Sequence, residues 1–220
     1  MNYKYVVLDF GKVLVFPTTG DWHITPKFLE LIDINKVDKE QLNELIKKYS
    51  YLLSEKLITL EEEYDMFIRF YDDILSNLNI PNYDIGIAKE IAHDRTYNHS
   101  KYTLYDDIYS ELDKLREKYK LILLTDNWPC VTKYLKDNKL DRYFEKVYIS
   151  SVYQTLKKDG LFFDYPIKDF NIKKGEALFI DDTEENLDAA IDKGFDVLLM
   201  DREKEVHSSK YRIINDLYNL

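Results

Sequence analysis

Five short apolar runs, each followed by polar residues, constrain the fold of this chain more than any other feature. The apolar residues in these runs are continuous rather than alternating, which is typical of parallel strands covered on both faces. We therefore expect a mostly parallel, five-stranded sheet. The runs occupy residues 5–8, 121–124, 146–149, 177–180 and 197–200.

Helical periodicity between the later runs completes the pattern of an α/β core. Apolar residues at helical spacing predict helices over 104–119, about 129–138 and 184–193, and Gly194 supplies a stop after the last of them. Strands that alternate with helices are typical of a doubly wound α/β fold, in which helices cover both faces of one sheet. We predict this Rossmann-like architecture for the core.

Residues from about 17 to 98 show helical spacing and no convincing strand. Thr59 and Glu62 form a capping-box pattern ahead of an amphipathic run that extends to about Asn77, and a second helical pattern covers 38–56. We therefore predict an all-helical insert placed after the first strand. The predicted division assigns 1–16 and 99–220 to the α/β core and 17–98 to the insert.

Composition and charge exclude several classes of protein. Hydrophobic residues make up 45% of the chain, which is globular composition, and Cys130 is the single cysteine, which excludes an intramolecular disulfide and a cysteine zinc cluster. The net charge is −10, and Lys and Arg occur locally only as pairs, so we expect no nucleic-acid partner. There is no run of eighteen apolar residues and no signal peptide pattern, so we expect no membrane association. The expectation is a cytoplasmic monomer or small homo-oligomer.

Polar side chains follow the first four apolar runs directly. Because the carboxyl ends of parallel strands share one edge of the sheet and ligands bind there, we expect these side chains to meet. A loop after the third run adds a pair of lysines, Lys157 and Lys158. The residues after the runs are, in chain order, Asp9, Thr125 with Asp126, Ser150 with Ser151, and Asp181 with Asp182.

These residue types suit phosphoryl transfer. Acidic groups at three strand ends would repel one another without a cation between them, and oxygen ligands without His or Cys favour Mg²⁺ over zinc. The metal and a lysine would offset charge on phosphoryl oxygens while a carboxylate attacks phosphorus. A single Asp after a strand is more often a turn or a helix cap, so the inference depends on the joint placement.

The same segments, in this order, resemble the four motifs of the haloacid dehalogenase (HAD) superfamily. They read VVLDFGKVLV, LILLTDN, SSVYQTLKKD and LFIDDTEENLDAA, with Lys158 where proline is usual. The helical insert resembles the cap of that family, which closes over the substrate. The resemblance implies Asp9 as nucleophile, Thr125 as phosphate-binding hydroxyl, Lys157 as the motif-three lysine, Asp181 and Asp182 as metal-site acids, and Asn186 as a residue that supports them.

The resemblance also implies a reaction and a cofactor. It indicates a Mg²⁺-dependent phosphatase that acts on a small phosphorylated metabolite through an aspartyl phosphate on Asp9. The metal ligands would be Asp9, the carbonyl of Gly11, and one or both of Asp181 and Asp182. Phosphate would be bound by the backbone amides of Phe10 and Gly11 and by Thr125, Asp126, Asn127 and Lys157.

Motif one departs from the common family pattern at Gly11. Many family phosphatases have a second Asp there, which protonates the leaving group, and such acid–base catalysis contributes about 10²–10⁴-fold. A subgroup with Asp-hydrophobe-Gly-x-Val is similar to sugar-phosphate phosphatases and lacks that acid as well. Lys12 stands where Gly is common, and the resemblance implies no role for a lysine at this position. We expect water or a substrate hydroxyl to assist the proton transfer.

Other functions remain open. Haloacid dehalogenases use the same attacking Asp without a metal, but they show Tyr where this chain has Gly11. A reaction without a metal also does not explain the acidic pair Asp181 and Asp182. A signalling receiver uses similar residues in another order and has no place for the insert. A fold that binds without catalysis is the third alternative, and Gly11 favours it.

Four aromatic or imidazole side chains are candidates for substrate contact, although packing explains them equally well. Three lie in the predicted insert, and the fourth follows motif two. Bulky residues of this kind suit a small, shielded pocket. They are Trp22, His23, Tyr97 and Trp128.

Overall fold

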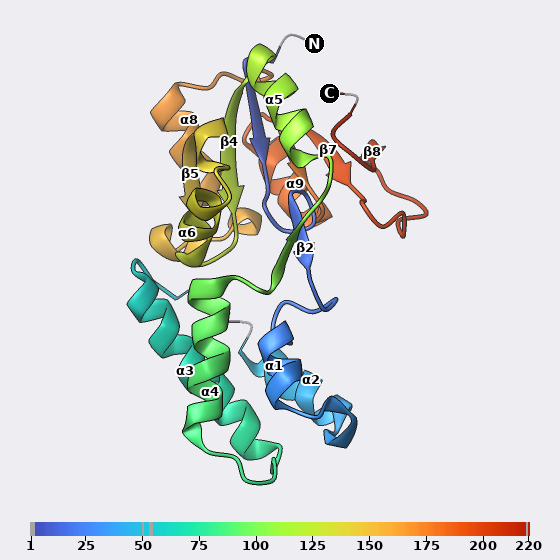
Figure 1. Ribbon diagram of the computed structural model, residues 1–220. Coiled ribbons are helices and arrows are strands. Elements are labelled where there is room, and N and C mark those ends of the chain that lie inside the picture. The colour runs from blue at the N-terminus through green and yellow to red at the C-terminus, as the bar shows by residue number, and fades with distance from the viewer. Residues whose placement is uncertain (1–2, 50, 53–54, 219) are drawn as a thin grey trace.

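The computed structural model describes residues 3–49, 51–52, 55–218 and 220. Its centre is a six-stranded parallel sheet in the order β5-β4-β1-β6-β7-β8 (Figure 1). The first strand of the chain lies in the middle, paired with β4 on one side and β6 on the other. The strands are β1 (Tyr5–Leu8), β4 (Lys120–Thr125), β5 (Phe144–Ile149), β6 (Ala177–Asp181), β7 (Asp196–Met200) and β8 (Ile213–Ile214).

The prediction of five strands in this sheet was wrong by one. The additional strand, β8, has two residues and pairs in parallel with the end of β7, Leu199 opposite Ile213 and Met200 opposite Ile214. Two half-buried residues at a sheet edge produce no apolar run, so the sequence carries no signal of this strand. The other five strands coincide with the predicted runs to within two residues.

Helices cover both faces of the sheet, which confirms the predicted doubly wound α/β class. Within β1, Val6 and Leu8 point into one apolar cluster and Val7 into the other, and all three are fully buried. Burial on both faces explains the continuous apolar runs, because each such side chain contributes about 1.5–3 kcal/mol. The helices of this part are α5 (Ile108–Lys118), α6 (Cys130–Asp137), α7 (Ser150–Tyr153), α8 (Asp164–Phe170) and α9 (Glu184–Asp192), with 3₁₀ turns η4 (Asp141–Tyr143), η5 (Lys157–Asp159) and η6 (Leu161–Phe163).

A short antiparallel ribbon connects the sheet to the helices of the predicted insert. β2 (Val15–Pro17) pairs with β3 (Tyr102–Leu104), and the chain between them runs through the helices in the lower part of Figure 1, here called the helical lobe. Because β3 extends to Leu104, the predicted helix 104–119 begins only at Ile108. The elements of the helical lobe are α1 (Pro26–Leu31), η1 (Ile34–Lys36), α2 (Lys39–Lys48), α3 (Leu60–Asn77), α4 (Ile85–His93) and the π-helix η3 (Asp94–Asn98).

The longest helix, α3, follows the predicted pattern. The Thr59 side chain accepts from the Glu62 backbone N–H at 3.1 Å, and the Glu62 carboxylate accepts from the Thr59 N–H at 3.0 Å, so the capping box is formed. The helix ends at Asn77, as predicted. Of the predicted segment 38–56, α2 covers residues 39–48, and residues 50 and 53–54 lie outside the described part of the chain.

The π-helix at the end of the helical lobe buries three successive residues, Asp94, Arg95 and Thr96. Its last turn closes with the His99 N–H donating to the Asp94 carbonyl at 2.9 Å, and His99 has a left-handed backbone with φ of 61°. Single π-helical turns of this kind occur frequently at functional sites. Three consecutive residues are thus buried in this turn, whereas a surface helix buries residues three or four apart.

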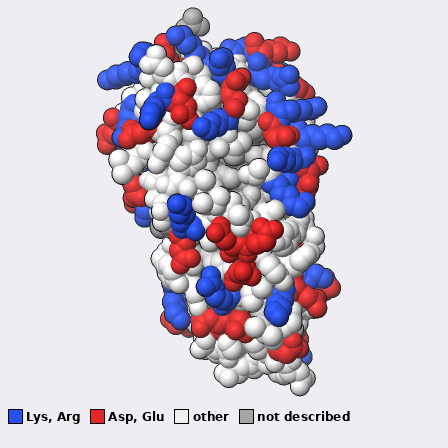
Figure 2. Space-filling model, turned by 90° about the vertical axis from the view of Figure 1, so that its left-hand side faces the viewer, with Lys and Arg blue, Asp and Glu red and all other residues white. Residues whose placement is uncertain are grey.

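Acidic and basic side chains intermix on the face of the molecule drawn in Figure 2, and Lys and Arg side chains gather along its upper right edge. A group of acidic side chains lies near the middle of that face. Among the described residues, no helix is both long enough and apolar enough to cross a membrane.

Candidate active site

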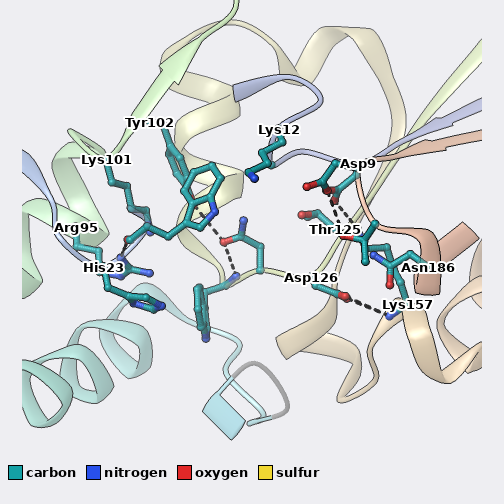
Figure 3. Close-up of a pocket in the computed structure, with 16 residues that line it drawn as sticks. Asp9, Lys12, His23, Arg95, Lys101, Tyr102, Thr125, Asp126, Lys157 and Asn186 are labelled. Carbon is teal, nitrogen blue, oxygen red and sulfur yellow. Dashed lines mark hydrogen bonds and ion pairs between the residues drawn. The ribbon is translucent and has the colours of Figure 1, made fainter. Parts of the chain in front are cut away.

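Three predicted site residues lie at the carboxyl ends of neighbouring strands. Asp9 follows β1, Thr125 ends β4 and Asp181 ends β6, and these strands are adjacent in the sheet. Asp9 and Thr125 line one side of a cavity of about 390 Å³ that lies between the sheet and the helical lobe (Figure 3), and Asp181 is buried beside it. This is the edge at which open α/β sheets bind their ligands.

Lys157 contacts three acidic residues at this edge of the sheet. Its buried ammonium lies 2.6 Å from Asp9 Oδ1 and 2.6 Å from Asp181 Oδ2, and its backbone N–H donates to Asp126 Oδ1 at 3.1 Å. Burial alone would lower the pKa of Lys157, but the carboxylates of Asp181, Asp9 and Asp126 raise it above the ordinary value. The lysine is therefore a permanent cation at this edge of the sheet. Its neighbour Lys158 is exposed.

The two acids after β6 have different surroundings. Asp181 is fully buried, and its second oxygen, Oδ1, accepts from the Thr183 N–H at 2.8 Å and from Asn186 Nδ2 at 3.0 Å. Asp182 lines the cavity, and its side chain has a long hydrogen bond of 3.4 Å with the Thr183 hydroxyl. Asp181 is thus held on both oxygens, whereas Asp182 faces the open space.

The carboxylates of Asp9, Asp181 and Asp182 each offer an oxygen within 4.8 Å of the others. Burial raises the pKa of Asp9 to about 8, and Asp181 and Asp182 add to this effect while Lys157 opposes it. Burial and Asp181 also raise the pKa of Asp182. Three ionised carboxylates around one ammonium would carry excess negative charge, and the raised pKa values of Asp9 and Asp182 reflect that cost, so the donor set fits a divalent cation with a preference for oxygen.

The loop after β4 is held by its own side chains. Asn127 Oδ1 accepts from the Trp128 N–H at 3.0 Å and from the Tyr102 hydroxyl at 3.2 Å, and the Asn127 N–H donates to Ser150 Oγ at 3.0 Å. Asp126 accepts from the backbone of Lys157. These contacts fix the loop beside Thr125, which is buried at the floor of the cavity.

The loop after β1 supplies Gly11 and Lys12 to the cavity wall, whereas Phe10 points away from it. The Phe10 ring is buried edge-on against Tyr102, with ring centroids 5.1 Å apart. A Cβ on Gly11 would lie 3.4 Å from the Trp22 ring and 4.0 Å from Asp9 Oδ2, which is ordinary contact. Lys12 has a left-handed backbone with φ of 55°, and its side chain extends into the cavity (Figure 3).

The opposite wall comes from the helical lobe and the start of β3. Of the four side chains that the sequence left open, Trp22, His23 and Trp128 line the cavity. Tyr97 is not among the lining residues and packs on Tyr64, with ring centroids 5.7 Å apart.

Sequence reasoning missed Arg95, Lys101 and Tyr102 in this wall. Arg95 belongs to the π-helix, whose irregular period hides its burial, and Lys101 and Tyr102 sit where the chain re-enters the sheet. The available signal was the segment RTYNHSKY, in which basic and aromatic residues alternate closely.

A family model described as haloacid dehalogenase-like hydrolase matches residues 29–200 of this chain. Among curated proteins, a D-ribitol-5-phosphate phosphatase of Bacteroides thetaiotaomicron is 30% identical over 89 residues. That match covers 37% of this chain and 43% of the relative, so the chain spans less than half the length of the curated protein it matches.

Solved structures share the fold over almost the whole chain. A HAD family enzyme from Bacteroides thetaiotaomicron has a TM-score of 0.68 at 22% identity, covering 93% of this chain and 97% of that one. A variant of that enzyme with one aspartate replaced by alanine was solved with magnesium and inorganic phosphate, and it has a TM-score of 0.56. An L-2-haloacid dehalogenase from Xanthobacter autotrophicus has a TM-score of 0.67 at 15% identity, covering 98% and 95% of the two chains.

Proposed function

Because this chain belongs to the haloacid dehalogenase-like hydrolase family, we propose that it is a Mg²⁺-dependent phosphatase that hydrolyses a small phosphorylated metabolite through an aspartyl phosphate on Asp9. The observation that carries the proposal is the buried ammonium of Lys157, 2.6 Å from both Asp9 and Asp181, beside a cavity that Thr125 and Asp182 also line. A cation next to an attacking carboxylate suits a substrate whose reacting group is itself anionic. The partial likeness to a ribitol-phosphate phosphatase supports the same reaction class.

The chemistry proceeds in two displacements at phosphorus. In the first, an oxygen of Asp9 attacks phosphorus, the bond from phosphorus to the ester oxygen breaks, and the leaving alkoxide takes up a proton. In the second, water attacks the aspartyl phosphate and inorganic phosphate departs, which regenerates the Asp9 carboxylate. Asp9 Oδ1 is held by Lys157, so the attacking atom is Oδ2.

Cationic and donor groups of the chain hold the phosphoryl oxygens. Lys157 and the Thr125 hydroxyl act from the floor of the cavity, and the backbone amides of Phe10 and Gly11 act from the loop after β1. Asp126 and Asn127 keep the loop after β4 in place through their hydrogen bonds. This preorganisation lowers the barrier because little reorganisation is needed as charge develops.

Magnesium would be held by Asp9, the Gly11 carbonyl and Asp182. Asp182 is the better direct ligand of the two acids after β6, because Asp181 already bonds Lys157, Thr183 and Asn186. When bound, Mg²⁺ supplies positive charge to the phosphoryl oxygens. Asp181 then serves to position Lys157.

The proton for the leaving alkoxide comes from water or a substrate hydroxyl, because Gly11 carries no acid. Lys12 lines the cavity next to Gly11, so its ammonium stabilises negative charge on the departing oxygen. An enzyme that depends on such indirect proton delivery would show strong preference for substrates that supply a well-placed hydroxyl.

The test is phosphate release from a panel of sugar phosphates, polyol phosphates, nucleoside monophosphates and phospho-acids, with Mg²⁺ and with EDTA. We expect turnover that requires Mg²⁺ and falls by more than about 10³-fold in Asp9→Asn, with the unfolding temperature retained. Full activity of Asp9→Asn would overturn the nucleophile. The absence of phosphate release from every ester would favour a binding protein.

The rival reaction is hydrolysis of a carbon–halogen bond, which the dehalogenase-like fold also supports. That reaction needs no metal because halide leaves without phosphoryl charge to offset. Chloride release from 2-chloropropionate in the presence of EDTA, by the wild type and not by Asp9→Asn, would replace the phosphatase proposal.

A further inference from the structure

The cavity wall opposite Asp9 contains two buried cations. Arg95 and Lys101 are each 1% exposed, and both line the cavity from the side of the helical lobe (Figure 3). Within the described part of the chain, the ion pairs of buried lysines and arginines involve Lys157 and Arg202, not these two residues. Burial of a cation is costly when no anion accompanies it.

The contacts of Arg95 leave its charge uncompensated. One Nη1–H donates to the Trp22 carbonyl, and the guanidinium lies 3.9 Å from the centroid of the Phe67 ring and 5.4 Å from that of Trp128. Its buried Nε has no partner among the described residues. Aromatic faces and a carbonyl stabilise a guanidinium only in part, so it retains the capacity to bind an anion.

Lys101 has similar surroundings. Its ammonium lies 3.4 Å from Cys130 Sγ and 4.7 Å from the centroid of the Tyr102 ring. Burial raises the pKa of Cys130 to about 12, and Glu63 adds to the effect, so the sulfur is a neutral thiol at pH 7 and supplies no negative charge. The ammonium has three donors, and the thiol satisfies at most one of them.

Two buried acids, Asp94 and Glu63, lie near the two cations, but neither forms an ion pair with them among the described residues. Asp94 accepts from the side chains of Ser100 and Asn98. Glu63 bonds to the backbone instead. Its Oε2 accepts from the Cys130 backbone N–H at 2.7 Å, and it is not among the residues that line the cavity. Neither carboxylate lines the cavity, so the charges that face it from this wall are those of Arg95 and Lys101.

His23 adds a neutral polar group to the same wall. Its buried Nδ1 has no partner among the described residues, while the ring lies against Phe70 with centroids 5.2 Å apart. Burial, with Arg95 and Lys101 nearby, lowers the pKa of His23 well below its ordinary value. The ring offers a hydrogen bond to a ligand without adding charge.

We propose that Arg95, Lys101 and His23 form a second anion subsite, so that the substrate is a phosphate ester whose far end carries a carboxylate or a second phosphate. The inference rests on the proposed phosphatase reaction at Asp9. Trp22 and Trp128 also line this cavity, and they contact the carbon chain of the substrate. A volume of about 390 Å³ suits a small metabolite of this kind.

The test compares three pentose derivatives phosphorylated on carbon five: ribitol phosphate, phosphoribonate, which ends in a carboxylate, and ribitol bisphosphate, which ends in a second phosphate. We expect kcat/KM for one of the two doubly anionic esters to exceed that for ribitol phosphate by about 10–100-fold, mainly through KM. The better of the two identifies the terminal group. Equal kcat/KM for all three esters, with Mg²⁺-dependent phosphate release intact, would overturn this subsite and leave the phosphatase proposal standing.

The variants Arg95→Gln and Lys101→Gln test whether these two residues cause the preference for the doubly anionic ester. Each should lower kcat/KM for the doubly anionic ester at least about tenfold more than kcat/KM for ribitol phosphate. The matched control is Lys89→Gln, which removes an exposed cation of the same lobe and should change nothing. Equal losses for all esters would mean that the two residues act only in folding.

Binding calorimetry on Asp9→Asn separates this inference from the reaction itself. The doubly anionic ester should bind about 10–100-fold more tightly than ribitol phosphate, and Lys101→Gln in the same background should abolish the difference. If no ester is hydrolysed by the wild type but this difference persists, the subsite stands and the phosphatase proposal fails. If the affinities are equal, the subsite fails whatever the reaction.

Discussion

Lys157 and Asp181 form a fully buried ion pair with their charged atoms 2.6 Å apart, and the second oxygen of the carboxylate is hydrogen-bonded as well. The acid next to it in sequence, Asp182, instead faces the cavity. This contrast separates a residue that holds the lysine from one that is available to a metal ion.

The two acids should therefore respond differently to the same substitution. Asp182→Asn should raise the Mg²⁺ concentration for half-maximal activity by at least about tenfold, with little change in stability. Asp181→Asn should lower the free energy of unfolding by about 3 kcal/mol, because Lys157 loses a buried partner. Magnesium titration of phosphate release and urea unfolding check the two outcomes, and the reverse pattern would exchange the roles.

Gly11→Asp should raise phosphate release from generic esters by about 10–100-fold if the absent acid limits the rate. The added Cβ would lie 3.4 Å from the Trp22 ring, which is ordinary contact. Gly11→Ala is the control, because it adds the Cβ without the acid and should leave kcat unchanged. An unchanged rate in Gly11→Asp would mean that another group already delivers the proton.

Lys101→Met should make the protein more stable. The substitution replaces a buried cation that forms no ion pair with a carboxylate among the described residues by an apolar chain of similar length, and we expect a gain of about 1–3 kcal/mol in the free energy of unfolding. Urea unfolding at pH 7 measures it, with Lys89→Met as the exposed control. A loss of stability would show that Lys101 is well compensated and would weaken the case for an anion beside it.

His99 should make stability fall in mild acid. Burial lowers the pKa of His99 to about 4, and Lys101 and Lys133 add to this effect while Asp137 opposes it. The folded protein thus resists protonation of this ring, so its contribution to stability is complete above about pH 6.5 and is lost as the pH falls toward 4. After allowance for solvent screening, we expect a loss of about 1–2 kcal/mol between pH 7 and pH 5.

His99→Asn should remove that part of the pH dependence. Asn tolerates the left-handed backbone that His99 adopts, with φ of 61°, so the turn should remain. Urea unfolding of both proteins at pH 5 and pH 7 gives the comparison. Parallel pH curves for wild type and variant would assign the acid sensitivity to other groups.

The sequence predicted the core and the near wall of the cavity for one physical reason: parallel strands bury both faces, and their ends gather the polar residues that follow. Asp9, Thr125 and Asp181 are placed by that rule alone. β8 was not predicted because its two residues at the sheet edge are too few to form an apolar run. Arg95 and Lys101 were not predicted as cavity residues. Arg95 lies in a π-helix and Lys101 directly precedes the ribbon of β2 and β3, and these two segments show no regular period in the sequence. The domain boundaries and the roles of the site residues stay predictions.

The ribbon of β2 and β3 has a consequence for how such an enzyme could change its substrate. β2 begins four residues after Gly11, and β3 begins with Tyr102, directly after Lys101, so the pairing of Pro17 with Tyr102 connects the two walls of the cavity. The register of this ribbon sets the distance between the wall that binds the reacting phosphate and the wall that binds the far end of the substrate. Lengthening or slipping this pair of strands would select longer or shorter substrates while the chemistry at the sheet edge stays the same.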